Sequence, residues 1–349
     1  MNLERKKFKD VDLENSFFDS LKSDYKEFPI WFVKKHDDFA YIFYSDNQII
    51  DGFLYLKIED NELLDINPTF PAARRLKVGT MKINAHGTKL GERFIKKIFD
   101  HAIYENVEEI YVTVFSDHAS LISLFKKYGF IHKADKTTQN GTELVLVKLF
   151  KDQYLNVVNN YPLVNLTTNN IYLLSLKPEW HTRLLPDSIL NTENSDIVQD
   201  ISHTNSIHKV YLTAMRNIDN LKQGDVLLVY RTSDEAGRAF YKSVSTSICV
   251  VEEYKNIQEF LSMEEFLKYC RPYSVFTEDE LKNFWNRKKY PHIIRFTYNI
   301  ALKKRVTRGD MINDFGLNGN DYWGFLKLSK EQFINIIRKG LVDENLIIH

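Results

Sequence analysis

One short segment of this chain constrains its fold more than any other. Residues 80–99 have the sequence TMKINAHGTKLGERFIKKIF, whose apolar spacing predicts a short strand, a tight turn and an amphipathic helix. The turn gathers the backbone amides from Gly87 to Gly91 around the start of that helix. Helix-start amides are unpaired donors at the positive end of the helix dipole, so the segment is typical of a diphosphate-binding turn.

The segments around this turn alternate between strands and helices. Residues 109–115 are β-branched and aromatic, which predicts a strand. Residues 118–128 have an apolar face and are followed by Gly129, which predicts a helix that ends there. One further strand is expected to begin at Phe130 and another to cover residues 142–150. Upstream of the turn, residues 39–44 and 49–59 are expected to form a hairpin.

This order of elements resembles the GNAT family of acetyl-CoA-dependent acyltransferases. The resemblance is carried by HGTKLGERF at the turn and SLFKKYGFI at the second helix. It implies an α/β (α+β) fold, with a mixed twisted sheet and flanking helices, over residues 1–152. It also implies acetyl-CoA (CoA) as the cofactor, with splayed strands that expose backbone groups near residues 81–84 to the pantetheine arm. The expected cofactor-binding residues are Met81, Ile83, Gly87, Thr88, Lys89, Leu90, Gly91 and Lys126.

Two positions depart from the family pattern. The turn usually carries two glycines, of which only Gly91 is present, although Gly87 adds conformational freedom. Many members also carry a tyrosine four residues before the Gly of Gly-Phe, where it protonates the departing thiolate. This chain has Phe125 at that position, and Tyr128 lies on a different side of the helix. The resemblance therefore leaves the general acid unassigned.

Two carboxylates are the candidates for catalysis. Glu59 follows the strand expected to line the acceptor cleft, where a carboxylate can deprotonate an ammonium directly or through water. The sequence Glu59-Asp60-Asn61 is also typical of a β-turn. Asp117 precedes the second helix, where a side chain can contact the thioester, although an N-cap role explains it as well. His86 is either a substrate contact or a surface residue of the turn.

The length and composition bound the rest of the molecule. The length of 349 residues favours two domains. The 47 basic and 47 acidic residues give no net charge, so any electrostatic attraction to nucleic acid or membrane must come from local patches. Cys249 and Cys270 have no metal-binding spacing, which favours a reducing cytoplasm. No apolar run approaches the length of a membrane span, and the many Lys, Asn, Ile and Tyr residues favour a bacterial source.

The second half has short strands first and helices inserted late. Residues 153–169 are expected to link the two domains. Strands are then predicted at 171–176, 210–215, 225–230, 245–254 and 292–298, and helices at 262–269, 278–287 and 329–338. Thr277 and Glu280 have the spacing of a capping box at the second of these helices.

This pattern resembles the PUA-like superfamily, particularly EVE- and ASCH-type domains. The resemblance is carried by NIYLLSLKPEW, LKQGDVLLVYRTSDEAG and STSICVVEEY. It implies a β-pseudobarrel over residues 170–349 that binds RNA or a modified nucleobase. The residues expected where its strand ends converge are Ser175, Lys177, Trp180, Tyr230 and Arg231. An aromatic face with donors suits a base or a phosphate, whereas Trp180 and Tyr230 are equally typical of a core.

The strongest local charge signal is in residues 286–309. This segment holds eight basic residues and no acidic one, with Tyr290, Phe296 and Tyr298 interleaved. Such a segment suits an RNA backbone with bases stacked beside it, and it equally suits a solvated surface. The expected phosphate contacts are Lys303, Lys304 and Arg305.

These features together predict a cytoplasmic N-acetyltransferase in which an amine attacks the thioester directly, with nucleic-acid recognition appended. The expected partners are acetyl-CoA and RNA, tRNA or a modified nucleobase, without metal or membrane. An RNA-linked acceptor amine would make the protein toxin-like, with a cognate antitoxin-like partner, and a homodimer is a further hypothesis. The alternative, favoured by Phe125, is a non-catalytic module that binds acyl-CoA and nucleic acid.

Overall fold

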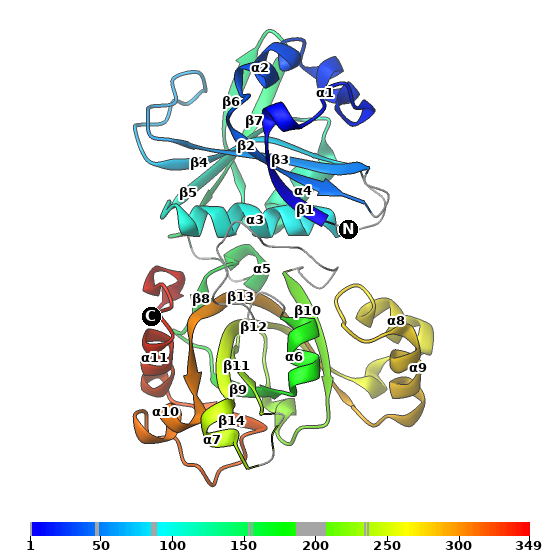
Figure 1. Ribbon diagram of the computed structural model, residues 1–349, viewed down its shortest axis with the longest axis vertical. Coiled ribbons are helices and arrows are strands. Elements are labelled where there is room, and N and C mark those ends of the chain that lie inside the picture. The colour runs from blue at the N-terminus through cyan, green and yellow to red at the C-terminus, as the bar shows by residue number, and fades with distance from the viewer. Residues whose placement is uncertain are drawn as a thin grey trace. The chain divides into compact units, whose positions relative to one another are not determined.

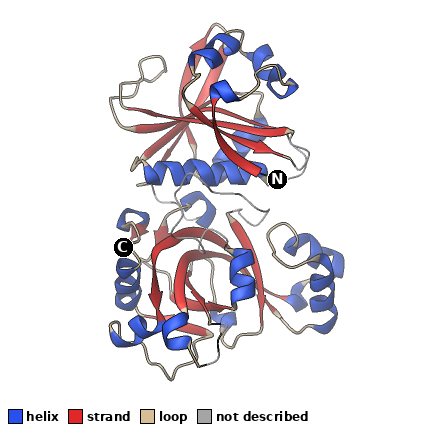
Figure 2. Cartoon of the chain, in the orientation of Figure 1, coloured by secondary structure: helices blue, strands red, loops and turns tan. Residues whose placement is uncertain are grey.

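The computed structural model describes residues 2–45, 49–84, 89–152, 154, 156–185, 207–233, 235 and 237–349. These residues form two compact units, one up to Tyr154 and one beyond it. Each unit combines strands with helices (Figure 1, Figure 2). The mixed α/β class predicted from the sequence is therefore confirmed.

The first unit is built on one seven-stranded sheet with the spatial order β1-β2-β3-β4-β5-β7-β6. Its strands are β1 (Asn2–Lys7), β2 (Phe39–Tyr44), β3 (Ile50–Glu59), β4 (Arg75–Ile83), β5 (Glu109–Phe115), β6 (Ile131–Thr138) and β7 (Gly141–Leu149). All neighbouring strands are antiparallel except β4 and β5, which are parallel. A parallel pair needs a crossover connection, which the helix α3 (Leu90–Tyr104) supplies.

Helices cover both faces of this sheet (Figure 1). The helices α3 and α4 (Ala119–Lys127) lie on one face, and the apolar side of α3 is buried there. The other face is covered by α1 (Asp19–Asp24) and α2 (Phe28–Lys34). Beneath α1 and α2 the ring centroid of Phe53 lies 5.5 Å from that of Phe8 and 5.3 Å from that of Phe18. These edge-to-face contacts fix the short helices on the sheet.

The pairing of β4 with β5 stops halfway along the two strands. Residues 75–78 pair with residues 109–112, whereas the rest of β4 pairs only with β3 and the rest of β5 only with β7. A bulge at Gly79 interrupts the β3–β4 register, and a Cβ at Gly79 would lie 2.7 Å from the Tyr55 ring. Because a bulge bends its strand, β4 turns away from β5 beyond Val78 and the sheet opens between them.

The second unit is built on a curved six-stranded sheet with the order β10-β13-β12-β11-β9-β14 (Figure 1). Its strands are β9 (Ile171–Leu176), β10 (His208–Thr213), β11 (Val226–Arg231), β12 (Val244–Asn256), β13 (His292–Thr307) and β14 (Phe325–Leu328). Its helices are α5 (Val157–Asn160), α6 (Pro178–Leu184), α7 (Ala239–Lys242), α8 (Met263–Cys270), α9 (Glu278–Arg287), α10 (Arg308–Asn313) and α11 (Lys330–Lys339).

Most predicted elements are present, and some bounds differ. β2, β5, β9 and α9 have the predicted bounds, and Thr277 and Glu280 form the expected capping box. β4 begins at Arg75 rather than at residue 80, and β13 runs to Thr307 rather than to residue 298. Within the segment expected to be a linker, α5 and β8 (Val164–Asn165) form part of the second unit, where β8 pairs with β15 (Ile347–Ile348).

Candidate functional site

A groove of about 870 Å³ lies where β4 and β5 separate in the first unit. It is bordered by residues of β3, β4, β5 and β7, of α1 and α2, and of the first turns of α3 and α4. Both predicted catalytic carboxylates, Glu59 and Asp117, line it. Three of the predicted cofactor-binding residues, Met81, Ile83 and Gly91, line it as well.

The N-terminus of α3 forms one end of the groove. Lys89 is the N-cap residue of α3, and its own side chain makes no capping hydrogen bond. Gly91 lies in the first turn, where a Cβ would be 2.9 Å from Leu124 Cδ2, so glycine lets α3 pack closely against α4 here. Leu90 is 1% exposed and is not among the residues that line the groove. Lys126 is exposed on α4.

Three residues of the predicted diphosphate turn cannot be placed. His86, Gly87 and Thr88 lie outside the described residues.

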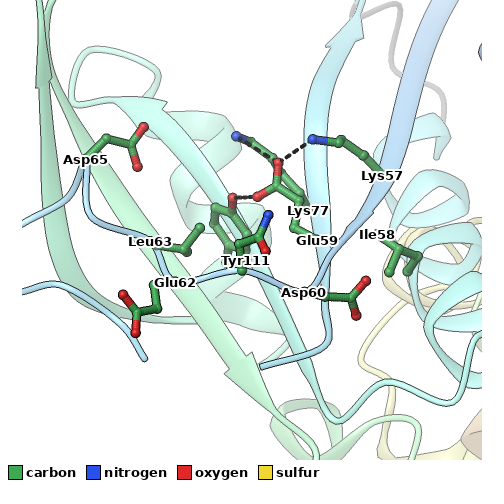
Figure 3. Close-up of a pocket in the computed structure, with 10 residues that line it drawn as sticks. Lys57, Ile58, Glu59, Asp60, Glu62, Leu63, Asp65, Lys77 and Tyr111 are labelled. Carbon is green, nitrogen blue, oxygen red and sulfur yellow. Dashed lines mark hydrogen bonds and ion pairs between the residues drawn. The ribbon is translucent and has the colours of Figure 1, made fainter. Parts of the chain in front are cut away.

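Glu59 lies in a second hollow, of about 480 Å³, that shares residues with the groove (Figure 3). It is the last residue of β3, and its carboxylate accepts a hydrogen bond from the Tyr111 hydroxyl. Its Oε1 also lies 3.0 Å from Lys57 Nζ and 3.7 Å from Lys77 Nζ. Burial opposes ionisation, but the Tyr111 hydrogen bond and the two ammonium groups outweigh it and lower the pKa of Glu59. Glu59 is therefore an ionised carboxylate that two lysines already neutralise.

Asp117 lies at the opposite side of the groove and is exposed. The N-cap residue of α4 is His118, and the Asp117 carbonyl accepts a hydrogen bond from Ala119 N at 2.9 Å. The N-cap explanation of Asp117 is therefore wrong, because the helix begins one residue later than expected. Its carboxylate is solvated at the groove rim.

Phe125 does not face the groove. Its side chain is 0% exposed, and its ring centroid lies 4.9 Å from that of Phe130. Tyr128 is also buried. In the described part of α4, therefore, the position that carries a tyrosine in the resembled family points into the core.

We expect Phe125→Tyr to leave turnover unchanged and to destabilise the first unit by about 1–3 kcal/mol, because the new hydroxyl would be buried without a partner. Thermal melts and rates should be compared with those of Phe125→Leu, which changes packing but adds no polar atom. A faster variant of unchanged stability would show that residue 125 reaches the groove.

One wall of the groove is formed by residues that were not predicted from the sequence. Tyr25, Phe28 and Trp31 contribute to it from the α1–α2 region, and Glu143 contributes from β7. The Tyr25 hydroxyl donates a hydrogen bond to Glu143 Oε1 at 3.0 Å. Burial and then the charge of Glu143 raise the pKa of Tyr25, so this hydroxyl stays protonated. The aromatic run FPIWF was a visible signal, but the sequence did not indicate which strands it would cover.

In the second unit, three of the predicted nucleic-acid-binding side chains take part in packing. The Ser175 hydroxyl donates to the Trp323 carbonyl, and Tyr230, which is 2% exposed, lies 5.4 Å from the Trp323 ring between centroids. Trp180 is half-buried, with its ring centroid 4.9 Å from that of Phe276. These contacts favour the core alternative for Trp180 and Tyr230. Lys177 is exposed and Arg231 is half-buried.

The charges of two of the predicted cations act on a buried histidine. His181 of α6 is 0% exposed, and its Nε2 lies 2.7 Å from Thr246 Oγ1 of β12. Its Nδ1 has no hydrogen-bond partner among the described residues. Burial, followed by the charges of Arg231 and Arg305, lowers the pKa of His181 to about 4. The positive charges of Arg231 and Arg305 therefore add to burial in keeping the imidazole neutral.

The basic segment 286–309 is divided between two places. Residues 287–289 are exposed at the end of α9, whereas Lys303, Lys304 and Arg305 are exposed in an irregular part of β13, where its pairing with β12 shifts register. Between them Arg295 pairs with Glu252 at 3.2 Å. Phe296 and Tyr298 are buried in the core, so the expectation that they lie beside RNA bases is wrong.

Among the described residues, no helix is long and apolar enough to cross a membrane. No group of side chains among them has the composition of a metal site.

No protein-family profile and no curated protein matches the chain. Solved structures similar to it include both classes that the sequence resembles. The NatC complex bound to Gag peptide and CoA is 15% identical, covering 43% of this chain and 99% of that one, with a TM-score of 0.30. A GNAT-family acetyltransferase from Streptococcus pneumoniae is 13% identical, covering 42% and 98%, with a TM-score of 0.30. ASCH from Zymomonas mobilis is 10% identical, covering 48% and 94%, with a TM-score of 0.31.

Proposed function

We propose that the first unit is an N-acetyltransferase that takes acetyl-CoA as its acyl donor and an amine as its acceptor. The observation that carries the proposal is the separation of β4 from β5 above a groove that reaches the N-terminus of α3. The unpaired edge of β4 offers backbone groups to the amide-rich pantetheine arm. A thioester in the gap would be open to direct attack by an amine from the α1–α2 side.

The residues at the α3 end of the groove fit the diphosphate of the donor. The first amides of this 15-residue helix lie at the positive end of its dipole, and Gly91 allows a close approach to them. Met81 and Ile83 would flank the pantetheine arm. Further main-chain donors or charges are proposed from Gly87, Thr88, Lys89, Leu90 and Lys126.

The acceptor must lose a proton before its nitrogen can attack. Glu59 and Asp117 are the sequence-based candidates for this role, and both line the groove. Because a general acid contributes on the order of 100- to 10,000-fold and a thiolate is already a fair leaving group, the buried Phe125 predicts slow turnover rather than none.

The burial of Phe125 is also the observation that favours the alternative, a non-catalytic acyl-CoA-binding module. A thiol-release assay with a broad panel of amines, run from neutral to alkaline pH, separates the two proposals. Release of CoA that depends on an added amine supports the enzyme. A flat signal at every pH, with acetyl-CoA bound, supports the binding module.

For the second unit we propose recognition of RNA or a modified nucleobase near the start of α6. The supporting observation is the placement of two basic residues side by side: Lys177 is the N-cap residue of α6, and Arg231 lies opposite Leu176, the residue before it, in the β9–β11 register. An RNA-linked acceptor amine would make the protein toxin-like and place its action in the cytoplasm. A small DNA-binding protein encoded next to it would be the expected antitoxin-like partner, and a homodimer remains a hypothesis.

Replacing Lys303, Lys304 and Arg305 together by Ser should weaken RNA binding and make it less dependent on salt, by about one unit of slope for each phosphate that is no longer neutralised. Acetyl-CoA affinity should not change. Filter binding of small RNA over a salt series measures the effect.

The matched control removes the same charge at the end of α9, by replacing Arg287, Lys288 and Lys289 with Ser. This control should bind RNA more tightly than the first triple variant. Equal losses in both variants, or no loss in either, would contradict an interface at residues 303–305.

A further inference from the structure

Glu143 is a buried carboxylate in the wall of the groove. Its side chain is 6% exposed, yet it lines the 870 Å³ space. Within the described residues its hydrogen-bond partner is the Tyr25 hydroxyl, at 3.0 Å, and no Lys, Arg or His there pairs with it. Its cross-strand neighbour Lys136 pairs instead with Asp65 at 2.6 Å. A buried carboxylate without a cation is unfavourable, so this site calls for one.

Glu59, unlike Glu143, already has cationic partners. Two ammonium groups, those of Lys57 and Lys77, already neutralise the Glu59 carboxylate, and the Tyr111 hydroxyl occupies its other oxygen (Figure 3). Another ammonium approaching Glu59 would also meet those two lysines at close range. Of these two buried carboxylates, Glu143 is therefore the more favourable neighbour for a cationic acceptor.

The surroundings of Glu143 are aromatic. Tyr25, which holds the carboxylate, has its ring centroid 5.3 Å from that of Phe115, and Glu143 lies directly opposite Phe115 in the β5–β7 register. Phe28 and Trp31 line the same wall, with centroids 5.5 Å apart. Aromatic faces attract ammonium groups and also cover apolar surface.

We propose that Glu143, held by Tyr25, is the site that binds the acceptor's ammonium group and takes its proton. The acceptor class is a primary amine with an apolar or aromatic group next to its nitrogen. The groove as a whole is not cationic, because its five lysines are matched by four carboxylates besides Glu143: Asp24, Glu27, Glu59 and Asp117. This inference rests on the proposed acetyltransferase function.

Atoms and electrons balance in the proposed transfer. The ammonium gives one proton to Glu143, and the neutral nitrogen forms the C–N bond to the acetyl carbonyl carbon. The C–S bond breaks, its electron pair stays on sulfur, and the second nitrogen proton goes to that thiolate. The products are the N-acetylated amine, the CoA thiol and one proton, which Glu143 releases to solvent.

Ligand-observed NMR titration tests the site without turnover, using phenethylamine and the uncharged phenethyl alcohol as probes. The unmodified chain should bind phenethylamine about 10- to 100-fold more tightly than phenethyl alcohol, because only the amine can make an ionic hydrogen bond to Glu143. Glu143→Gln should remove the preference for the amine, whereas the matched change at exposed Glu108, Glu108→Gln, should keep it.

Thermal melts and acetyl-CoA titrations of each variant complete the design. Glu143→Gln should keep its fold and its acetyl-CoA affinity. An unmodified chain that does not prefer the amine, or a Glu143→Gln variant that still does, would overturn the proposed site. Failure of every variant to bind acetyl-CoA would instead overturn the acetyltransferase function, because the amine titration is carried out without the donor.

Discussion

Replacing Gly91 by Glu is expected to abolish acetyl-CoA binding. Any side chain at this position of α3 must displace Leu124, whose Cδ2 would lie 2.9 Å from the new Cβ. A glutamate also brings a negative charge to the helix end where the diphosphate would bind. In the unmodified protein, acetyl-CoA at about 100 times its dissociation constant should stabilise the folded state by about 2.7 kcal/mol. The variant should show no increase in melting temperature with the ligand.

Gly91→Ala is the matched control for this change. Its methyl group meets only the flexible end of Leu124, and it relieves the cost of a glycine within a helix, about 1 kcal/mol. It should fold as well as the original chain and keep most of the ligand-dependent shift. A Gly91→Glu variant that keeps the full shift would show that the diphosphate does not bind at the start of α3.

Arg75→Leu is expected to destabilise the first unit by about 3–5 kcal/mol, because it removes one member of a buried charged network. Arg75 is 2% exposed, its Nε lies 2.6 Å from Glu109 Oε1, and its other nitrogens donate to the carbonyls of Asn61, Pro71 and Ala73. Arg75 and Glu109 face each other at the paired end of β4 and β5. This network therefore holds the two strands together below the point where they separate.

Hydrogen exchange of the peptides that contain β4 and β5 measures the loss of stability of the first unit, independently of the stability of the second unit. The neighbouring Arg74 provides the control, because it is exposed and its pair with Glu105, at 2.9 Å, lies on the surface. Arg74→Leu should cost less than about 1 kcal/mol. Equal costs for the two variants would contradict the structural role given to Arg75.

Local patterns were sufficient to predict many elements of both units. The bounds of β5 and β9 follow from dense β-branched and aromatic residues, and α9 follows from its capping box. The opening between β4 and β5 came from the family resemblance and is confirmed by their pairing. Each of these features depends on neighbouring residues or on a familiar order of elements.

The features that sequence analysis missed depend on contacts between distant residues. Tyr25 and Glu143 are 118 positions apart, and they meet only because α1 and α2 pack over the β5–β7 register. The burial of Phe296 and Tyr298 has a similar cause, since β13 is an inner strand that lies between β10 and β12. Composition alone could not indicate which side of that strand would face the core.

Isothermal titration of the full chain with acetyl-CoA tests the central claim most directly. The account predicts saturable binding at one site per chain, with a dissociation constant between about 1 µM and 1 mM, the usual range for enzyme substrates. The same titration of Gly91→Glu should give no binding heat. Absence of saturable binding by the unmodified chain would contradict the proposal that the groove between β4 and β5 holds an acyl donor.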